Sequence, residues 1–159
     1  MTEFEPAVLV LAAALRARGR KLVTAESCTG GMIAAACTAV AGSSDWFERG
    51  FVTYSNDAKS QSLGVPAGLI EAHGAVSAEV ARAMAEGALR HSRADLAVAV
   101  TGIAGPTGGT PNKPVGTVWL GIAQSGAEPV TELLNLGGDR AAVRSQTVQI
   151  ALQRLIERA

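Results

Sequence analysis

The chain has 159 residues, a formal net charge of zero and an isoelectric point near 6.7. This neutral charge and an aromatic content of only 4% argue against a nucleic-acid-binding surface, which needs basic side chains and stacking rings. No apolar stretch reaches the roughly 20 residues that span a bilayer, and the acidic start MTEFEP is unlike a signal peptide. We therefore expect one cytoplasmic domain over residues 1–159 that binds neither nucleic acid nor membranes.

The first part of the chain predicts a helix, a strand, a second helix and a second strand. Apolar residues at helical spacing form the first helix, and Gly19 ends it because glycine readily adopts the left-handed conformation found there. The β-prone segment 20–25 follows as a strand, and apolar residues recur at helical spacing within 29–40. Gly42 then breaks the chain before a strand at 50–54.

The middle of the chain continues this alternation. Two short helices are expected at 57–62 and 66–72, and Ser77 is placed to cap a longer helix. The continuous apolar run within 95–101 is typical of a strand that is buried on both faces. Alternating helices and strands indicate an α/β fold in which these strands run parallel.

The last part of the chain departs from the alternation. The strands expected at 115–123 and 130–136 are joined by a short link without a helix, which requires an antiparallel hairpin. Asp139 then caps a final helix. We therefore predict a three-layer α/β/α sandwich around a mixed, mostly parallel sheet. The strand 130–136 is expected at a sheet edge, where it is available for contacts in a homodimer.

The motif TAESCTGG over residues 24–31 stands at a strand-to-helix turn. Unpaired backbone N–H groups and the positive end of a helix dipole point at a ligand there. A hydroxyl or thiol at that place can attack a carbonyl carbon while N–H groups stabilise the oxyanion. Ser27 and Cys28 are the two candidate nucleophiles, and Glu26 is expected to be a local hydrogen-bond partner. The structural alternative is that Ser27 or Thr29 merely caps the helix.

Two more predicted strands end in unusual polar segments. VTYSNDAK, residues 52–59, brings hydroxyls and a lysine, and TGIAGPTGGTP, residues 101–111, is too rich in glycine for a simple connector. Open α/β sheets bind their ligands at the carboxyl ends of the strands. The three segments are therefore expected to form one pocket.

Together these motifs closely resemble the CinA C-terminal domain family. The resemblance rests on TAESCTGG, on VTYSNDAK and on the run AVAVTGIAGPTGGTPNKPVGTVWLGIA, and it covers residues 6–156. Stand-alone members of this family are nicotinamide-nucleotide amidases, whereas larger members carry an additional N-terminal domain. The resemblance implies hydrolysis of the carboxamide of nicotinamide mononucleotide (NMN) to nicotinate mononucleotide and ammonia, without a metal or organic cofactor.

The resemblance also implies the catalytic residues: Ser27 as the nucleophile, Lys59 as its base and Tyr54 as their partner. A neutral lysine near pH 7 requires a pKa well below the usual value of about 10.4, which burial can supply. The Tyr54 hydroxyl would either relay a proton between Ser27 and Lys59 or orient the substrate. The structural alternatives are a solvated helix lysine and a tyrosine buried against backbone.

A further set of residues is expected to bind the substrate through backbone N–H groups, a hydroxyl or a charge: Thr29, Gly30, Gly31, Thr101, Gly102, Ala104, Gly105 and Arg140. The three that open the helix would form an oxyanion site. The loop residues would approach the substrate closely, because glycine there permits a positive φ. Arg140, at the start of the last helix, is the candidate for the phosphate, with Arg144 and Lys113 as alternatives.

Two other functions remain open from the sequence. The first is a non-catalytic nucleotide-binding module linked to competence or damage responses, and the second is an amidase for another small amide. A metal site is not expected, because His73 and His91 stand in no metal-ligand spacing.

Overall fold

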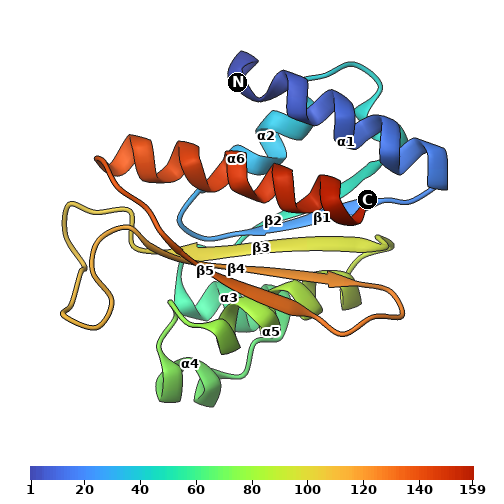
Figure 1. The fold of residues 1–159 in the computed structure, drawn as a ribbon. Coiled ribbons are helices and arrows are strands. Elements are labelled where there is room, and N and C mark those ends of the chain that lie inside the picture. The colour runs from blue at the N-terminus through green and yellow to red at the C-terminus, as the bar shows by residue number, and fades with distance from the viewer.

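The computed structural model describes all 159 residues, and they fold into three layers (Figure 1). A five-stranded sheet forms the middle layer. Its strands are β1 (Leu22–Glu26), β2 (Phe47–Val52), β3 (Leu96–Gly102), β4 (Thr117–Gln124) and β5 (Val130–Asn135). One face of the sheet is covered by α1 (Glu5–Arg18), α2 (Met32–Thr38) and α6 (Arg140–Arg158). The other face is covered by α3 (Asn56–Leu63), α4 (Ala67–His73) and α5 (Ala78–Arg90).

The sheet has the strand order β2-β1-β3-β4-β5 and is mixed. β1 pairs in parallel with both β2 and β3, whereas β4 pairs antiparallel with both β3 and β5. Four strands therefore point one way and β4 points the other. The predicted α/β sandwich, its mixed sheet and its hairpin of the last two strands are confirmed. β5 lies at an edge, as expected, and its use in a homodimer stays a prediction.

The bounds of two predicted elements differ most from the observed ones. The helix expected over 29–40 spans only Met32–Thr38. It begins late because Gly30 and Gly31 have positive φ values of 59° and 104°. The strand expected at 50–54 is β2, which starts earlier and stops at Val52. β2 is an edge strand with mostly exposed or half-buried side chains, so its first residues show no apolar pattern.

The hydrophobic core lies on both faces of the sheet. One apolar cluster fills the space under α1, α2 and α6, and a smaller one fills the space under α3, α4 and α5. All five residues of β1 are buried, as is nearly all of β3. The two central strands are therefore fixed from both sides, and their carboxyl ends form a rigid support for the loops that follow.

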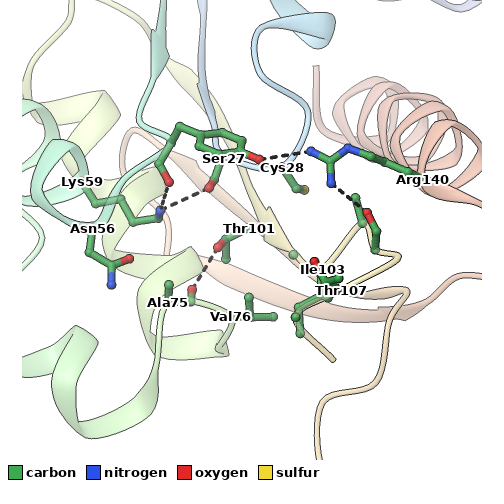
Figure 2. A pocket seen from close by; sticks show the side chains of 15 residues that line it. Ser27, Cys28, Asn56, Lys59, Ala75, Val76, Thr101, Ile103, Thr107 and Arg140 are labelled. Carbon is green, nitrogen blue, oxygen red and sulfur yellow. Dashed lines mark hydrogen bonds between the residues drawn. The ribbon is translucent and has the colours of Figure 1, made fainter. Parts of the chain in front are cut away.

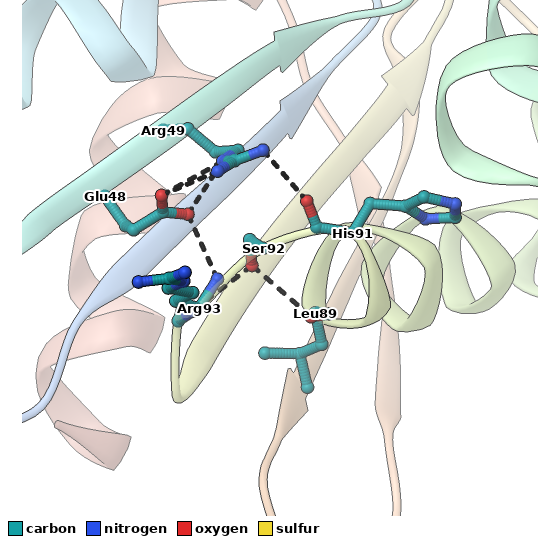
Figure 3. A network of polar contacts seen from close by, with 7 residues as sticks. Glu48, Arg49, Leu89, His91, Ser92 and Arg93 are labelled. Carbon is teal, nitrogen blue, oxygen red and sulfur yellow. Dashed lines mark hydrogen bonds and ion pairs between the residues drawn. The ribbon is translucent and has the colours of Figure 1, made fainter.

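A polar network joins the edge strand β2 to the segment between α5 and β3 (Figure 3). The Glu48 carboxylate accepts hydrogen bonds from Arg49 Nε (2.8 Å) and from the Arg93 backbone N–H (3.2 Å), and the Arg49 guanidinium donates to the His91 carbonyl (3.1 Å). The hydrogen bond from Arg49 lowers the pKa of Glu48. None of these residues lines the cavity described below, so His91 belongs to a structural network and not to that cavity.

The structure contains no helix with the length and apolar character that a membrane span requires.

Candidate active site

A cavity of about 320 Å³ lies where the chain leaves β1, β2 and β3 (Figure 2). This volume is at the lower end of what small-molecule sites offer. The three segments that were expected to meet do meet here. The lining residues are Ser27, Cys28, Tyr54, Asn56, Lys59, Ala75, Val76, Thr101, Gly102, Ile103, Ala104, Gly105, Thr107, Gly108 and Arg140.

Ser27 and Lys59 are in direct contact in the cavity wall. Lys59 Nζ donates to Ser27 Oγ at 3.1 Å and to the backbone carbonyl of Tyr54 at 3.2 Å (Figure 2). Lys59 is only 1% exposed and has no carboxylate partner within salt-bridge distance. Burial lowers the pKa of Lys59, because removal from water disfavours the charged amine. The alternative that Lys59 is a solvated helix lysine is therefore wrong, and this amine is suited to accept a proton.

The local sequence explains how Lys59 reaches this place. Ser55 caps α3, because its hydroxyl accepts from the Ala58 N–H at 3.0 Å, and Gly64 ends the helix in the left-handed conformation. Lys59 and Leu63, one turn apart, are the two buried residues of this helix. The lysine thus lies on the inward face of α3, and its long side chain extends to the end of β1.

The turn that carries Ser27 is held by a buried carboxylate. Glu26, fully buried at the end of β1, accepts from the Thr29 hydroxyl and from the N–H groups of Ile33 (2.8 Å) and Ala34 (3.0 Å). These N–H groups belong to the first turn of α2, so Glu26 caps this helix from a distance. The alternative that Ser27 or Thr29 merely caps the helix is wrong. Glu26 is the local hydrogen-bond partner that was predicted.

The structure does not bring Thr29, Gly30 and Gly31 into the cavity lining. The Thr29 hydroxyl is used by Glu26, and the Gly30 N–H donates to the Ser27 carbonyl at 3.0 Å. Among the lining residues, Cys28, Ala104 and Gly105 instead have backbone N–H groups that donate to no other residue. These groups are better placed than the helix start to meet an oxyanion.

The loop after β3 forms the wall opposite Lys59. Thr101, expected to bind the substrate, donates its hydroxyl to the Ala75 carbonyl at 3.0 Å and so joins two walls of the cavity. A side chain at Gly102 or Gly105 would force neighbouring atoms to shift. A Cβ at Gly102 would lie 2.6 Å from Val118 Cγ2, and one at Gly105 would lie 2.5 Å from Val115 Cγ1. The glycines therefore keep this wall thin and its backbone accessible.

Arg140 is the one of the three candidate phosphate ligands that lines the cavity. Its guanidinium donates to the Gly105 carbonyl at 2.9 Å and to the Tyr54 hydroxyl at 3.1 Å. Arg144 instead donates to the carbonyls of Cys28 and Thr29. Lys113 donates to the carbonyl of His73, the last residue of α4. Arg140 remains largely exposed, so its charge is accessible from the cavity mouth.

Tyr54 lies at the rim of the cavity and is 60% exposed. The alternative that Tyr54 is buried against backbone is therefore wrong. A proton relay through its hydroxyl does not fit the geometry either, because Lys59 contacts Ser27 directly and the Tyr54 hydroxyl is bonded to Arg140. The alternative role, orientation of the substrate, stays a prediction.

Cys28 lies beside Ser27 but is not an activated thiol. It is 5% exposed, and burial raises its pKa to about 12. A low pKa was expected at the start of a helix, but the helix begins four residues later and the thiol packs in the apolar core. Of the two candidate nucleophiles, Ser27 is thus the one with a base in contact.

Six lining residues were not named among the sequence candidates. Three of them, Ile103, Thr107 and Gly108, belong to the glycine-rich segment 101–111 that was expected to line the pocket. Asn56 stands within the motif 52–59, three residues before Lys59, and this helical spacing is a signal that could have identified it. Ala75 and Val76 come from the turn between α4 and α5 and carry no chemical signal. No three His, Cys, Asp or Glu side chains gather closely enough to hold a metal ion.

The fold and the site together define a class of protein. It is a three-layer α/β domain with a serine–lysine pair at the carboxyl ends of its strands. Residues 5–159 match the CinA C-terminal domain, and the chain belongs to that family. The chain is 56% identical over 142 residues to the nicotinamide-nucleotide amidohydrolase PncC of Escherichia coli K12, covering 89% of this chain and 86% of that protein. It is 62% identical over 142 residues to a CinA-like protein of Citrifermentans bemidjiense, but there it spans only 34% of the longer chain.

Solved structures agree with this assignment. The competence/damage inducible protein CihA of Agrobacterium tumefaciens superposes with a TM-score of 0.95 at 46% identity, covering 97% of this chain and 94% of that one. A CinA superfamily protein of E. coli superposes with a TM-score of 0.94 at 36% identity, covering 98% of this chain and 90% of that one. The family predicted from the three sequence motifs is confirmed.

Proposed function

We propose that this chain is an amidohydrolase that converts NMN to nicotinate mononucleotide and ammonia. The observation that carries the proposal is the contact of 3.1 Å between Lys59 Nζ and Ser27 Oγ inside the cavity. The name of the E. coli relative, at 56% identity, supports the substrate. The reaction belongs to the recycling of pyridine nucleotides in the cytoplasm.

The chemistry follows from the pair. Neutral Lys59 accepts the Ser27 proton while Oγ attacks the carboxamide carbon, and backbone N–H groups of the Cys28 turn and the Ala104–Gly105 wall stabilise the oxyanion. Lys59 then passes the proton to the leaving nitrogen, so the C–N bond breaks and ammonia departs. Water, activated by the same amine, hydrolyses the ester to Ser27 and frees the carboxylate. No step requires a metal or organic cofactor.

The substrate series NMN, nicotinamide riboside and nicotinamide tests this function. The purified protein should release ammonia fastest from NMN, because the ribose phosphate adds binding energy outside the reacting centre. Ammonia is measured by a coupled enzymatic assay. Equal rates from free nicotinamide would favour an amidase for another small amide. Binding of NMN without any ammonia release would favour the non-catalytic nucleotide-binding module.

Arg140→Met is expected to raise KM for NMN by about tenfold or more, because a charge-assisted contact to the phosphate is lost. The KM for nicotinamide riboside, which has no phosphate, should change by less than about threefold. Arg93→Met is the matched control, since Arg93 is exposed and lies in the network at β2, away from the cavity. Equal effects of Arg140→Met on both substrates would show that Arg140 does not hold the phosphate.

Cys28→Ala should keep ammonia release within about fivefold of the unmodified chain, because the buried protonated thiol takes no part and alanine retains the backbone N–H. Steady-state kinetics with NMN check this. A loss as large as that of Ser27→Ala would mean that the thiol is the nucleophile.

A further inference from the structure

Asn56 is an exposed polar side chain that lines the cavity and makes no hydrogen bond to another protein group. It opens α3, three residues before Lys59, so the two side chains share one helix face and both line the cavity (Figure 2). Its carboxamide makes no hydrogen bond within the chain, although it offers two donors and an acceptor. The neighbouring Thr101 hydroxyl, by contrast, already donates to Ala75.

The cavity offers several donors, and its side-chain acceptors other than Asn56 are hydroxyl groups. Lys59, Arg140 and the free N–H groups of Ala104 and Gly105 can all donate. A primary carboxamide needs donors for its oxygen, but its NH2 group needs acceptors. The Asn56 Oδ1 is a side-chain acceptor on the same wall as Lys59.

The reaction fixes where the substrate nitrogen must lie. In the mechanism proposed above, the proton that Lys59 takes from Ser27 is delivered to the leaving nitrogen. That nitrogen must therefore come within hydrogen-bond distance of Lys59 Nζ. Asn56 lies one helical turn from Lys59, on the side of the amine that is not occupied by Ser27 (Figure 2).

We propose that Asn56 recognises the amide nitrogen of the substrate. Its Oδ1 accepts one N–H of the substrate NH2 group while Ser27 Oγ bonds to the carbonyl carbon. When the C–N bond breaks, the nitrogen receives its third proton from Lys59 and leaves as ammonia from the same contact. Asn56 thus selects a primary amide over substrates whose leaving group has no N–H. This inference rests on the amidase function proposed above.

The test compares an amide with an ester of the same acid. kcat/KM is measured for NMN and for the methyl ester of nicotinate mononucleotide, whose methoxy group cannot donate to Asn56. Asn56→Leu should lower kcat/KM for NMN by about tenfold or more, while the value for the ester falls by less than about threefold. Gln61→Leu is the matched control, because it makes a similar change on the exposed face of the same helix. This control variant should change kcat/KM for neither substrate.

A conservative variant and a binding measurement complete the test. Asn56→Asp keeps an acceptor oxygen, so it should retain the preference for the amide, with its activity displaced to higher pH because the added charge favours protonated Lys59. On a Ser27→Ala background, Asn56→Leu should weaken the binding of NMN but not of the ester, as measured by calorimetry. Equal losses for both substrates in Asn56→Leu, or equal weakening of both ligands, would overturn the role of Asn56 while leaving the amidase function intact. Absence of turnover in the unmodified chain would instead overturn both.

Discussion

Replacing Ser27 by alanine is expected to lower kcat for ammonia release from NMN by at least about a hundredfold. The change removes only the Oγ that Lys59 contacts, whereas the backbone bond from the Ser27 N–H to the Val100 carbonyl is kept. Binding of NMN should therefore change by less than about threefold, because the serine acts in the chemical step and not in ground-state binding. Steady-state kinetics and calorimetry measure the two quantities separately.

The thermal unfolding temperature provides the control for Ser27→Ala. It should stay within about 3 °C of that of the unmodified chain, since one small polar atom is removed without a large cavity. A correctly folded variant that keeps more than about a tenth of the activity would remove Ser27 from the mechanism.

Lys59→Met is expected to lose activity by at least about a hundredfold and to gain stability at neutral pH. Methionine fills much the same space without a basic nitrogen, so Ser27 has no base. Stability should rise because burial lowers the pKa of Lys59 below its usual value of 10.5. The folded chain therefore binds this proton less tightly than the unfolded chain, and protonation at lower pH favours unfolding.

The pH dependence of stability and of activity tests whether the lowered pKa of Lys59 explains both effects. The stability advantage of Lys59→Met should be largest below the folded pKa of Lys59 and should disappear above pH 10.5, where the lysine is neutral in both states. The activity of the unmodified chain should rise with pH as Lys59 loses its proton, with a midpoint below 10.5. Chemical denaturation and kcat/KM across the pH range measure both. Activity that falls with pH through this titration would mean that protonated Lys59 is the active form.

Much of the architecture could be predicted because local patterns determine it. The alternation of helices and strands gave a parallel arrangement for β1, β2 and β3, and the short link after β4 required the antiparallel hairpin. The three polar segments follow strands whose carboxyl ends share one edge of the sheet, so their convergence also followed from the sequence. The pairing of Ser27 with Lys59 came from the family resemblance, since spacing alone did not distinguish a base from a solvated lysine.

The directions of individual side chains could not be predicted. Thr29 belongs to the same motif as Ser27, yet its hydroxyl turns inward to Glu26, because the buried carboxylate needs a donor. Arg144 and Arg140 are one turn apart on α6, but only Arg140 lines the cavity. Such choices depend on contacts between distant segments, such as the one that brings Ala75 against Thr101, and no local pattern records them.

The central claim is that Ser27 hydrolyses the NMN carboxamide with Lys59 as its base and without a metal ion. Its most direct test is ammonia release from NMN by the purified protein in the presence of EDTA, with Ser27→Ala measured alongside. We predict steady release that EDTA does not affect and that the variant lacks. Release that EDTA abolishes, or that persists in the folded variant, would contradict the claim.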